Sequence, residues 1–184
     1  GFVFDLCGVE VDRITGQVRI DRYITVHDAG ILLNPDLAGG QVRGGFANGV
    51  GAALFEQFSY GLDGSFLSGT FADYLVPTAM EIPDIEILHL QTSSPVTPLG
   101  AKGVAEGNCM STPVCLANAV ADALGAGDIE LPMTPAKNAA LIESTEPPRP
   151  VHASTASLTL SSKAYAITGE GSAQVNAAPE AVWA

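Results

Sequence analysis

A loop of small residues, spanning residues 97–108, holds the side chains best suited to chemistry. One lysine, Lys102, and one glutamate, Glu106, stand among glycines that free the backbone to approach a ligand closely. If the loop is buried, Glu106 enters a low-dielectric cavity and binds its proton more tightly, as a general base working near neutral pH requires. Lys102 would oppose that change if it paired with Glu106. A second interpretation remains open, in which the loop lies at the surface and both charges are in water.

A glycine-rich stretch over residues 38–57 has the spacing of a helix. Its large apolar residues recur every four positions, and six glycines lie among them over residues 39–55. Each glycine in a helix interior costs about 1 kcal/mol. Because Gly45 and Gly49 fall on one face, we expect another backbone or a ligand to come close to that face. Tight packing of the helix against a sheet, without a ligand, is the alternative.

The rest of the pattern predicts an α+β fold, in which a mixed sheet with hairpins packs against helices. Alternating apolar residues and turn chemistry indicate hairpins over residues 4–26 and around 61–64, a strand over 85–87, and helices over 113–124 and 135–143. Thr112 is expected to cap the helix over 113–124, with Pro113 in its first turn and Gly125 at its end.

The chain is expected to contain three segments. Residues 1–145 form one domain, residues 146–157 a semi-rigid linker rich in Pro, Ser and Thr, and residues 158–184 the truncated start of another unit. The sequence has no initiating Met, and a helix has barely begun at Pro179 when it stops. We therefore expect a piece of a longer protein.

Charge and composition argue against several classes of protein. The formal net charge of −12 disfavours nucleic acid and anionic membranes as partners. No apolar run approaches the roughly 20 residues of a membrane-spanning helix, so no transmembrane segment is predicted. The three cysteines fit no zinc or disulfide spacing, which favours a location in the reducing cytoplasm.

The loop over residues 98–107 resembles a loop near the end of the large subunit of the molybdenum hydroxylases. This is the family of xanthine dehydrogenase, aldehyde oxidase and carbon monoxide dehydrogenase. Further stretches match in the same order: Val26-His27-Asp28-Ala29-Gly30 followed by Asn34-Pro35, residues 40–51, and Asp73-Tyr74 with Pro77-Thr78. The chain departs from the family's pattern at His27, Ala29, Asn48 and Ala105. The resemblance implies that residues 1–145 are the C-terminal part, or second half, of a molybdopterin-binding domain.

The resemblance also implies a role for each matching residue. Glu106 would be the general base that takes a proton from a hydroxide bound to molybdenum. The cofactor would lie against Asp28, Gln41, Gly44, Gly45, Lys102, Gly103, Val104 and Ala105. We expect Glu106 to face a cavity that it shares with Gln41 and the Gly44-Gly45 turn. Pterin sulfurs hold molybdenum in this family, so no residue of the chain is expected to bind the metal directly.

The implied enzyme oxidatively hydroxylates a small molecule of the aldehyde, purine, N-heterocycle or carbon monoxide class. Its cofactor would be molybdenum-molybdopterin in the cytosine dinucleotide form. Partner subunits or domains would carry 2Fe–2S clusters and FAD in an oligomeric holoenzyme, and the chain alone would be inactive. A cofactor-free binding or assembly module on the same fold is the alternative, favoured by Ala29, Asn48 and Ala105.

The C-terminal end carries a second resemblance. Residues 167–171 and 178–183 resemble the opening strand and helix of START-like domains, a class that includes proteins associated with carbon monoxide dehydrogenases. This implies a fused neighbour after the linker, and an assembly role centred on that end is a third hypothesis. A disordered tail is the competing interpretation.

Overall fold

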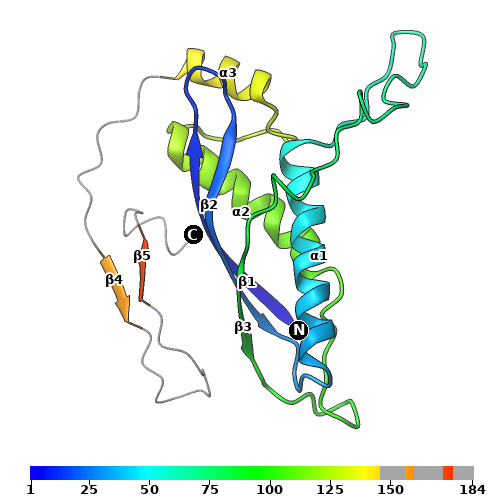
Figure 1. Cartoon of the computed structure of the whole chain (residues 1–184), viewed down its shortest axis with the longest axis vertical. Helices are drawn as coiled ribbons and strands as arrows, with labels where there is room; N and C mark the ends of the chain where they lie inside the picture. Colours follow the sequence, from blue (N-terminus) through cyan, green and yellow to red (C-terminus); the bar gives the residue numbers. More distant parts are fainter. Residues whose placement is uncertain (146–155, 160–171, 176–184) are drawn as a thin grey trace.

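The sheet that organises the chain is built around its central strand, β2. The computed structural model describes residues 1–145, 156–159 and 172–175. β1 (Phe2–Val11) and β2 (Val18–Asp28) form an antiparallel hairpin, and β3 (Glu86–Leu90) runs parallel to β2 on its other side (Figure 1). The mixed sheet and the hairpin predicted over residues 4–26 are therefore confirmed. Asp28 pairs with Leu90, so the carboxyl ends of β2 and β3 lie side by side.

The turn of this hairpin forms as the sequence predicts. The carboxylate of Asp12 accepts the amides of Ile14 and Thr15 at 2.7 and 3.0 Å, and Gly16 takes the left-handed conformation with φ of 72°. Helix α3 (Pro135–Ser144) confirms the helix predicted over residues 135–143. Its Asn138 donates a side-chain amide to the Gly16 carbonyl at 2.9 Å, which ties the turn to α3.

Helix α1 (Pro35–Leu54) is the predicted glycine-rich helix, although it begins before the expected residue 38. Asn34 caps it by accepting the amide of Leu37 at 3.1 Å, and Pro35 occupies the first turn, where its fixed φ suits a helix. The buried face carries Val42, Phe46 and Val50, as their spacing predicts.

Helix α2 spans Gly107–Leu124, so the predicted start at residue 113 is wrong. Thr112 is not a cap, because it lies fully buried inside the helix and accepts a hydrogen bond from the Tyr23 hydroxyl at 3.0 Å. Pro113 is also inside the helix, where it removes one backbone hydrogen bond. The predicted end is confirmed, since Gly125 closes the helix in the left-handed conformation. The early start makes Glu106 the residue that immediately precedes α2.

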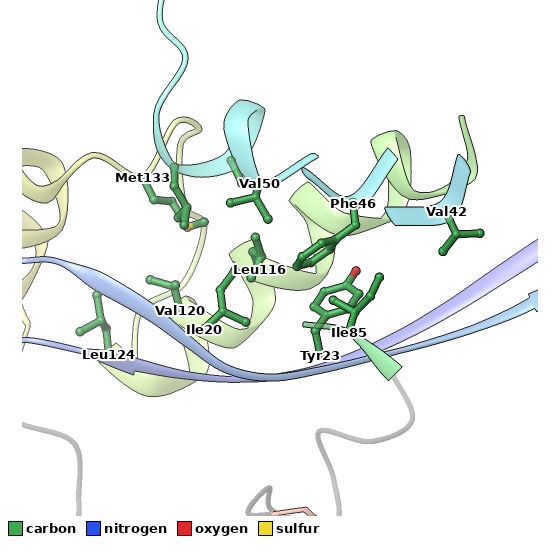
Figure 2. Close-up of a cluster of buried hydrophobic side chains, with 12 residues drawn as sticks. Ile20, Tyr23, Val42, Phe46, Val50, Ile85, Leu116, Val120, Leu124 and Met133 are labelled. Atoms are coloured by element: carbon green, nitrogen blue, oxygen red, sulfur yellow. The ribbon is translucent and has the colours of Figure 1, made fainter. Parts of the chain in front are cut away.

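The hydrophobic core lies between the β1–β2 hairpin and the two long helices (Figure 2). Tyr23 of β2 and Phe46 of α1 pack together in it, with ring centroids 4.5 Å apart. The other large buried side chains come from several elements: Ile20, Val42, Val50, Leu54, Ile85, Leu116, Val120, Leu124 and Met133. This core fixes α2 against both the hairpin and α1.

Helices α1 and α2 cross so closely that α1 requires glycine at the crossing. A Cβ at Gly49 would lie 2.6 Å from the Cβ of Thr112 and 2.8 Å from the carbonyl oxygen of Asn108. A Cβ at Gly45 would lie 3.4 Å from the Cβ of Asn108. The neighbour that comes close to the glycine face is therefore another helix backbone, one of the arrangements that the sequence left open.

Residues 55–85 connect α1 to β3 and contain the second predicted hairpin as a short antiparallel bridge. Tyr60 pairs with Phe66, and the Gly61 amide donates to the Ser65 carbonyl at 2.8 Å. This connection therefore reverses direction at the turn that the sequence indicates.

The C-terminal segments that the structure describes form a two-stranded antiparallel sheet of β4 (Ala156–Thr159) and β5 (Ser172–Val175). β4 begins inside the segment predicted as linker, and the helix predicted after Pro179 falls outside the described residues. Within the described part of the chain, no helix combines the length and apolar character needed to cross a membrane.

Candidate active site

Glu106 stands at the junction between the small-residue loop and α2. Glu106 has φ of −102° and ψ of 20° and is the last residue of the loop, since the helix begins at Gly107. The residue is exposed, and it lines an open cavity of about 1260 Å³ that runs along β1 and α2, past Val3 and Met110. The burial expected for this carboxylate is therefore not provided by the described residues, because none of their elements covers it.

The carboxylate of Asp28, at the end of β2, is fully buried, and both of its oxygens accept hydrogen bonds. Its Oδ1 accepts the backbone amides of Gly30 at 2.9 Å and Thr92 at 3.2 Å, and its Oδ2 accepts the Thr92 hydroxyl and the Lys102 Nζ, the latter at 2.7 Å. Burial raises the pKa of Asp28, but the hydrogen bonds from Lys102, Thr92 and Gly30 outweigh it and hold that pKa well below its usual range. Asp28 is therefore an anion whose acceptor positions are already filled by protein donors.

Lys102 pairs with Asp28 and not with Glu106. Its ammonium group also contacts the Thr92 hydroxyl, and its side chain is only 23% exposed. The backbone amide of Lys102 donates to the Ala29 carbonyl at 2.7 Å. Backbone and side chain of this residue therefore both tie the loop to the end of β2, and the pairing with Glu106 that the sequence left open does not form.

Thr92 is a member of this cluster that the sequence does not predict. It follows β3, and the parallel pairing of Asp28 with Leu90 brings it beside the Asp28 carboxylate. The strand predicted over residues 85–87 offers a signal for it, because residues just after neighbouring parallel strands gather at the same carboxyl edge of the sheet. The sequence did not show which strand would be the neighbour.

A second buried network lies on the other side of the loop. His27 Nε2 and Asn108 Oδ1 are 2.6 Å apart, and Asn108 Nδ2 donates to the Thr25 hydroxyl at 3.1 Å and to the Asp5 carboxylate at 3.4 Å. Since Asn108 donates through Nδ2, its Oδ1 is the acceptor and His27 Nε2 carries the proton. Asn108 lies in the first turn of α2, so this network fixes the start of the helix beside Glu106.

Not all of the predicted cofactor residues on α1 contact the loop that carries Glu106. Gln41 donates its side-chain amide to the Ala105 carbonyl at 3.0 Å, so it does contact the segment before Glu106. Gly45 faces α2, whereas Gly44, the residue directly before it, faces open space on the exposed side of the helix. The cavity that Glu106 lines includes none of these three α1 residues, so the predicted shared cavity is absent from the described residues.

The loop presents backbone donors directly before Glu106. Gly103, Val104 and Ala105 line the same cavity, and within residues 1–145 their N–H groups donate to no protein acceptor. Ala105 does not have a positive φ, so its methyl group causes no backbone strain where the family's pattern has glycine. Consecutive free N–H groups suit an oxygen-rich anionic group, and a neighbouring carboxylate suits proton transfer.

Known proteins resemble this chain in both sequence and structure. The family model described as a molybdopterin cofactor-binding domain matches residues 1–83. The nicotine 6-hydroxylase large subunit of Paenarthrobacter nicotinovorans is 42% identical over 132 residues, which are 70% of this chain and 16% of that protein. The carbon monoxide dehydrogenase large chain of Hydrogenophaga pseudoflava is 37% identical over 132 residues, again 70% of this chain and 16% of that protein. A solved Cu,Mo-carbon monoxide dehydrogenase in its carbon monoxide-reduced state has a TM-score of 0.72 and 34% identity, covering 75% of this chain and 18% of that one.

The fold and these matches define the class, an α+β domain similar to the molybdopterin cofactor-binding domains. The chain belongs to the molybdenum hydroxylase large-subunit family, as its resemblance to that family predicted. It spans only 16% of the length of the two curated relatives named above.

Proposed function

We propose that this chain is part of an enzyme that oxidatively hydroxylates a small molecule, with Glu106 as its general base. One observation carries the proposal: Glu106 lines an open cavity directly after three residues whose N–H groups have no acceptor in residues 1–145. Relatives are named for nicotine, carbon monoxide, xanthine and aldehyde. Those names support a substrate of the aldehyde, purine, N-heterocycle or carbon monoxide class without choosing among them.

The residues around Glu106 fit a molybdopterin group. Gly103, Val104 and Ala105 would hold its oxygen-rich atoms through their N–H groups, and Gln41 would steady this segment through the Ala105 carbonyl. When bound, the group supplies the redox centre that takes up the substrate's electrons. The carboxylate of Glu106 makes no cap hydrogen bond to α2, which leaves its oxygens available to accept a proton. We infer the cytosine dinucleotide form of the cofactor from the resemblance of the loop and of residues 26–51 to the family.

The proposal extends to partners, location and domain division. Iron–sulfur (2Fe–2S) and FAD groups on other subunits or domains would carry the electrons away within an oligomeric holoenzyme, and relatives named as large chains or as subunits of a complex support this. Three free cysteines in the described residues support a cytoplasmic location.

Residues 1–145, 146–157 and 158–184 would be the cofactor-binding part, a linker and the start of a START-like domain. Loss of turnover on deleting everything after residue 145 would favour an assembly role for that end.

The composition of the intact enzyme tests the proposal. The full-length large subunit is purified with its partners, and its molybdenum, iron, flavin and acid-released cytidine nucleotide are measured. We expect stoichiometric molybdenum and turnover of an aldehyde, a purine, an N-heterocycle or carbon monoxide. Molybdenum far below one equivalent in a folded complex would instead favour a cofactor-free binding module.

The role of Glu106 is tested in the same preparation. We expect Glu106→Gln to lower steady-state turnover by at least about 100-fold, because a positioned general base contributes roughly 10²–10⁴-fold. Glu143→Gln is the matched control, since Glu143 is an exposed glutamate of α3 that does not line the cavity. Equal turnover in the two variants at equal molybdenum content would exclude Glu106 as the base.

A further inference from the structure

The segment that carries Glu106 is held at both ends by neighbouring residues of β2. Asp28 bonds Lys102, just before residues 103–107, and His27 bonds Asn108, just after them. Successive residues of a strand point to opposite faces, so His27 and Asp28 can hold two different partners from one strand end. Both side chains are almost completely buried.

The Asp28 end of this arrangement is closed to a ligand. Its two oxygens accept four donors, from Gly30, Thr92 and Lys102, and the side chain has no exposed surface. A carboxylate offers about four acceptor positions, so none remains for a cofactor or substrate. The ion pair instead adds to the backbone bond between Lys102 and Ala29, and together they fix where the loop leaves the sheet.

The His27 end fixes the start of α2. His27 Nε2 and Asn108 Oδ1 are 2.6 Å apart, and Nδ2 of the same Asn108 side chain donates to the Thr25 hydroxyl. Gly107 lies against the imidazole, because a Cβ there would be 3.3 Å from a ring carbon of His27. Glu106 therefore lies between Lys102 and Asn108, which these bonds fix, and within the described part of the chain residues 103–106 make no hydrogen bond of their own to β2.

We propose that His27 and Asp28 are positioning residues for Glu106, acting through Asn108 and Lys102, rather than residues that contact the cofactor. The inference rests on the proposed role of Glu106 as the base. A displacement of about 1 Å at a reacting group can cost on the order of 100-fold in rate, so a carboxylate on an exposed loop needs anchors of this kind. The two buried networks supply them on either side of the loop.

Hydrogen exchange of the full-length subunit in its complex tests the anchors without relying on activity. Lys102→Met removes the ion pair, and Thr92→Val is a milder variant that removes one donor to Asp28. We expect exchange of the bonded amides on either side of the segment, at residue 102 (to the Ala29 carbonyl) and at Cys109 (to the Glu106 carbonyl), to accelerate at least about tenfold in Lys102→Met and less in Thr92→Val, since local opening governs exchange. Arg19→Met is the control, because it breaks an exposed pair with Glu10 on the same hairpin. Unchanged exchange in both test variants would overturn the proposal.

Turnover per molybdenum separates positioning from ligand contact. We expect Lys102→Met and His27→Leu to lower kcat by about 10–100-fold with KM nearly unchanged, and His27→Gln, which keeps a donor, to recover part of the loss. Loss of molybdenum, or a raised KM with normal kcat per molybdenum, would show ligand contact and overturn the proposal. Normal kcat in these variants alongside an inactive Glu106→Gln would refute the anchors alone. An active Glu106→Gln would refute the base, while the exchange result would still decide whether the anchors exist.

Discussion

Replacing Gly49 by alanine is expected to push α1 and α2 apart and to weaken the domain. The added methyl group would lie 2.6 Å from the Cβ of Thr112 and 2.8 Å from the carbonyl oxygen of Asn108. Neither atom is at the end of a flexible side chain, so the helices themselves must move. Because Asn108 is in the first turn of α2, the displacement falls next to Glu106.

The magnitude follows from two opposing effects. Overpacking of this kind costs about 1–3 kcal/mol, and removing a glycine from a helix interior returns up to about 1 kcal/mol. Two such short contacts place the cost in the upper part of its range, so we expect a net loss of about 1–2 kcal/mol, a factor of about 5–30 in the folding equilibrium. Gly44→Ala is the matched control: its Cβ would enter open space, and we expect it to stabilise α1 by about 0.5–1 kcal/mol.

Native-state hydrogen exchange of the full-length subunit measures both effects, since it reports the free energy of local opening. We expect Gly49→Ala to speed exchange in α1 and α2 and Gly44→Ala to slow exchange in α1. If both substitutions stabilised the helices equally, the close crossing of α1 and α2 would be refuted.

Three further predictions concern buried polar groups and are measured by chemical denaturation of the subunit. Tyr23→Phe removes the hydroxyl that donates to Thr112 at 3.0 Å, and we expect a loss of about 0.5–1.5 kcal/mol; unchanged stability would mean that the bond contributes nothing. Asn138→Ala removes side-chain bonds of 2.9 and 3.1 Å to two backbone carbonyls, and we expect a loss of about 1–3 kcal/mol; a loss below that range would show that water replaces the amide. Although burial opposes them, hydrogen bonds hold the pKa of Asp28 below its usual range, so its contribution is complete above about pH 4 and is lost as the pH falls further. The difference in unfolding free energy between wild type and Asp28→Asn should therefore shrink in acid, and a difference that grew in acid would contradict the pairing.

Local signals in the sequence are sufficient for the first hairpin and for α1. Asp12 and Gly16 supply the turn chemistry, and apolar residues four apart mark the buried face of α1. The start of α2 shows where local signals mislead. Thr112-Pro113 is a good local start for a helix, but Thr112 is buried against Gly49 and bonded by Tyr23, so tertiary packing places it inside the helix.

In the candidate site, the loop that carries Lys102 and Glu106 could be singled out from the sequence, but the partners of its side chains could not. Lys102 and Glu106 share one loop, which suggested a pair, yet Lys102 bonds Asp28 from a distant part of the chain. That bond depends on the parallel pairing of β2 with β3, which also brings Thr92 into the cluster. A single sequence contains no local signal for which strands pair or in which direction, so the bond between Asp28 and Lys102 could not be predicted from it.

The most direct test of Glu106 as the base is the rate of substrate oxidation in a single turnover by the assembled holoenzyme, with wild type and Glu106→Gln compared at equal molybdenum content. A general-base role predicts a rate lower by at least about 100-fold in Glu106→Gln, with substrate affinity retained. A single-turnover rate close to that of wild type would contradict it.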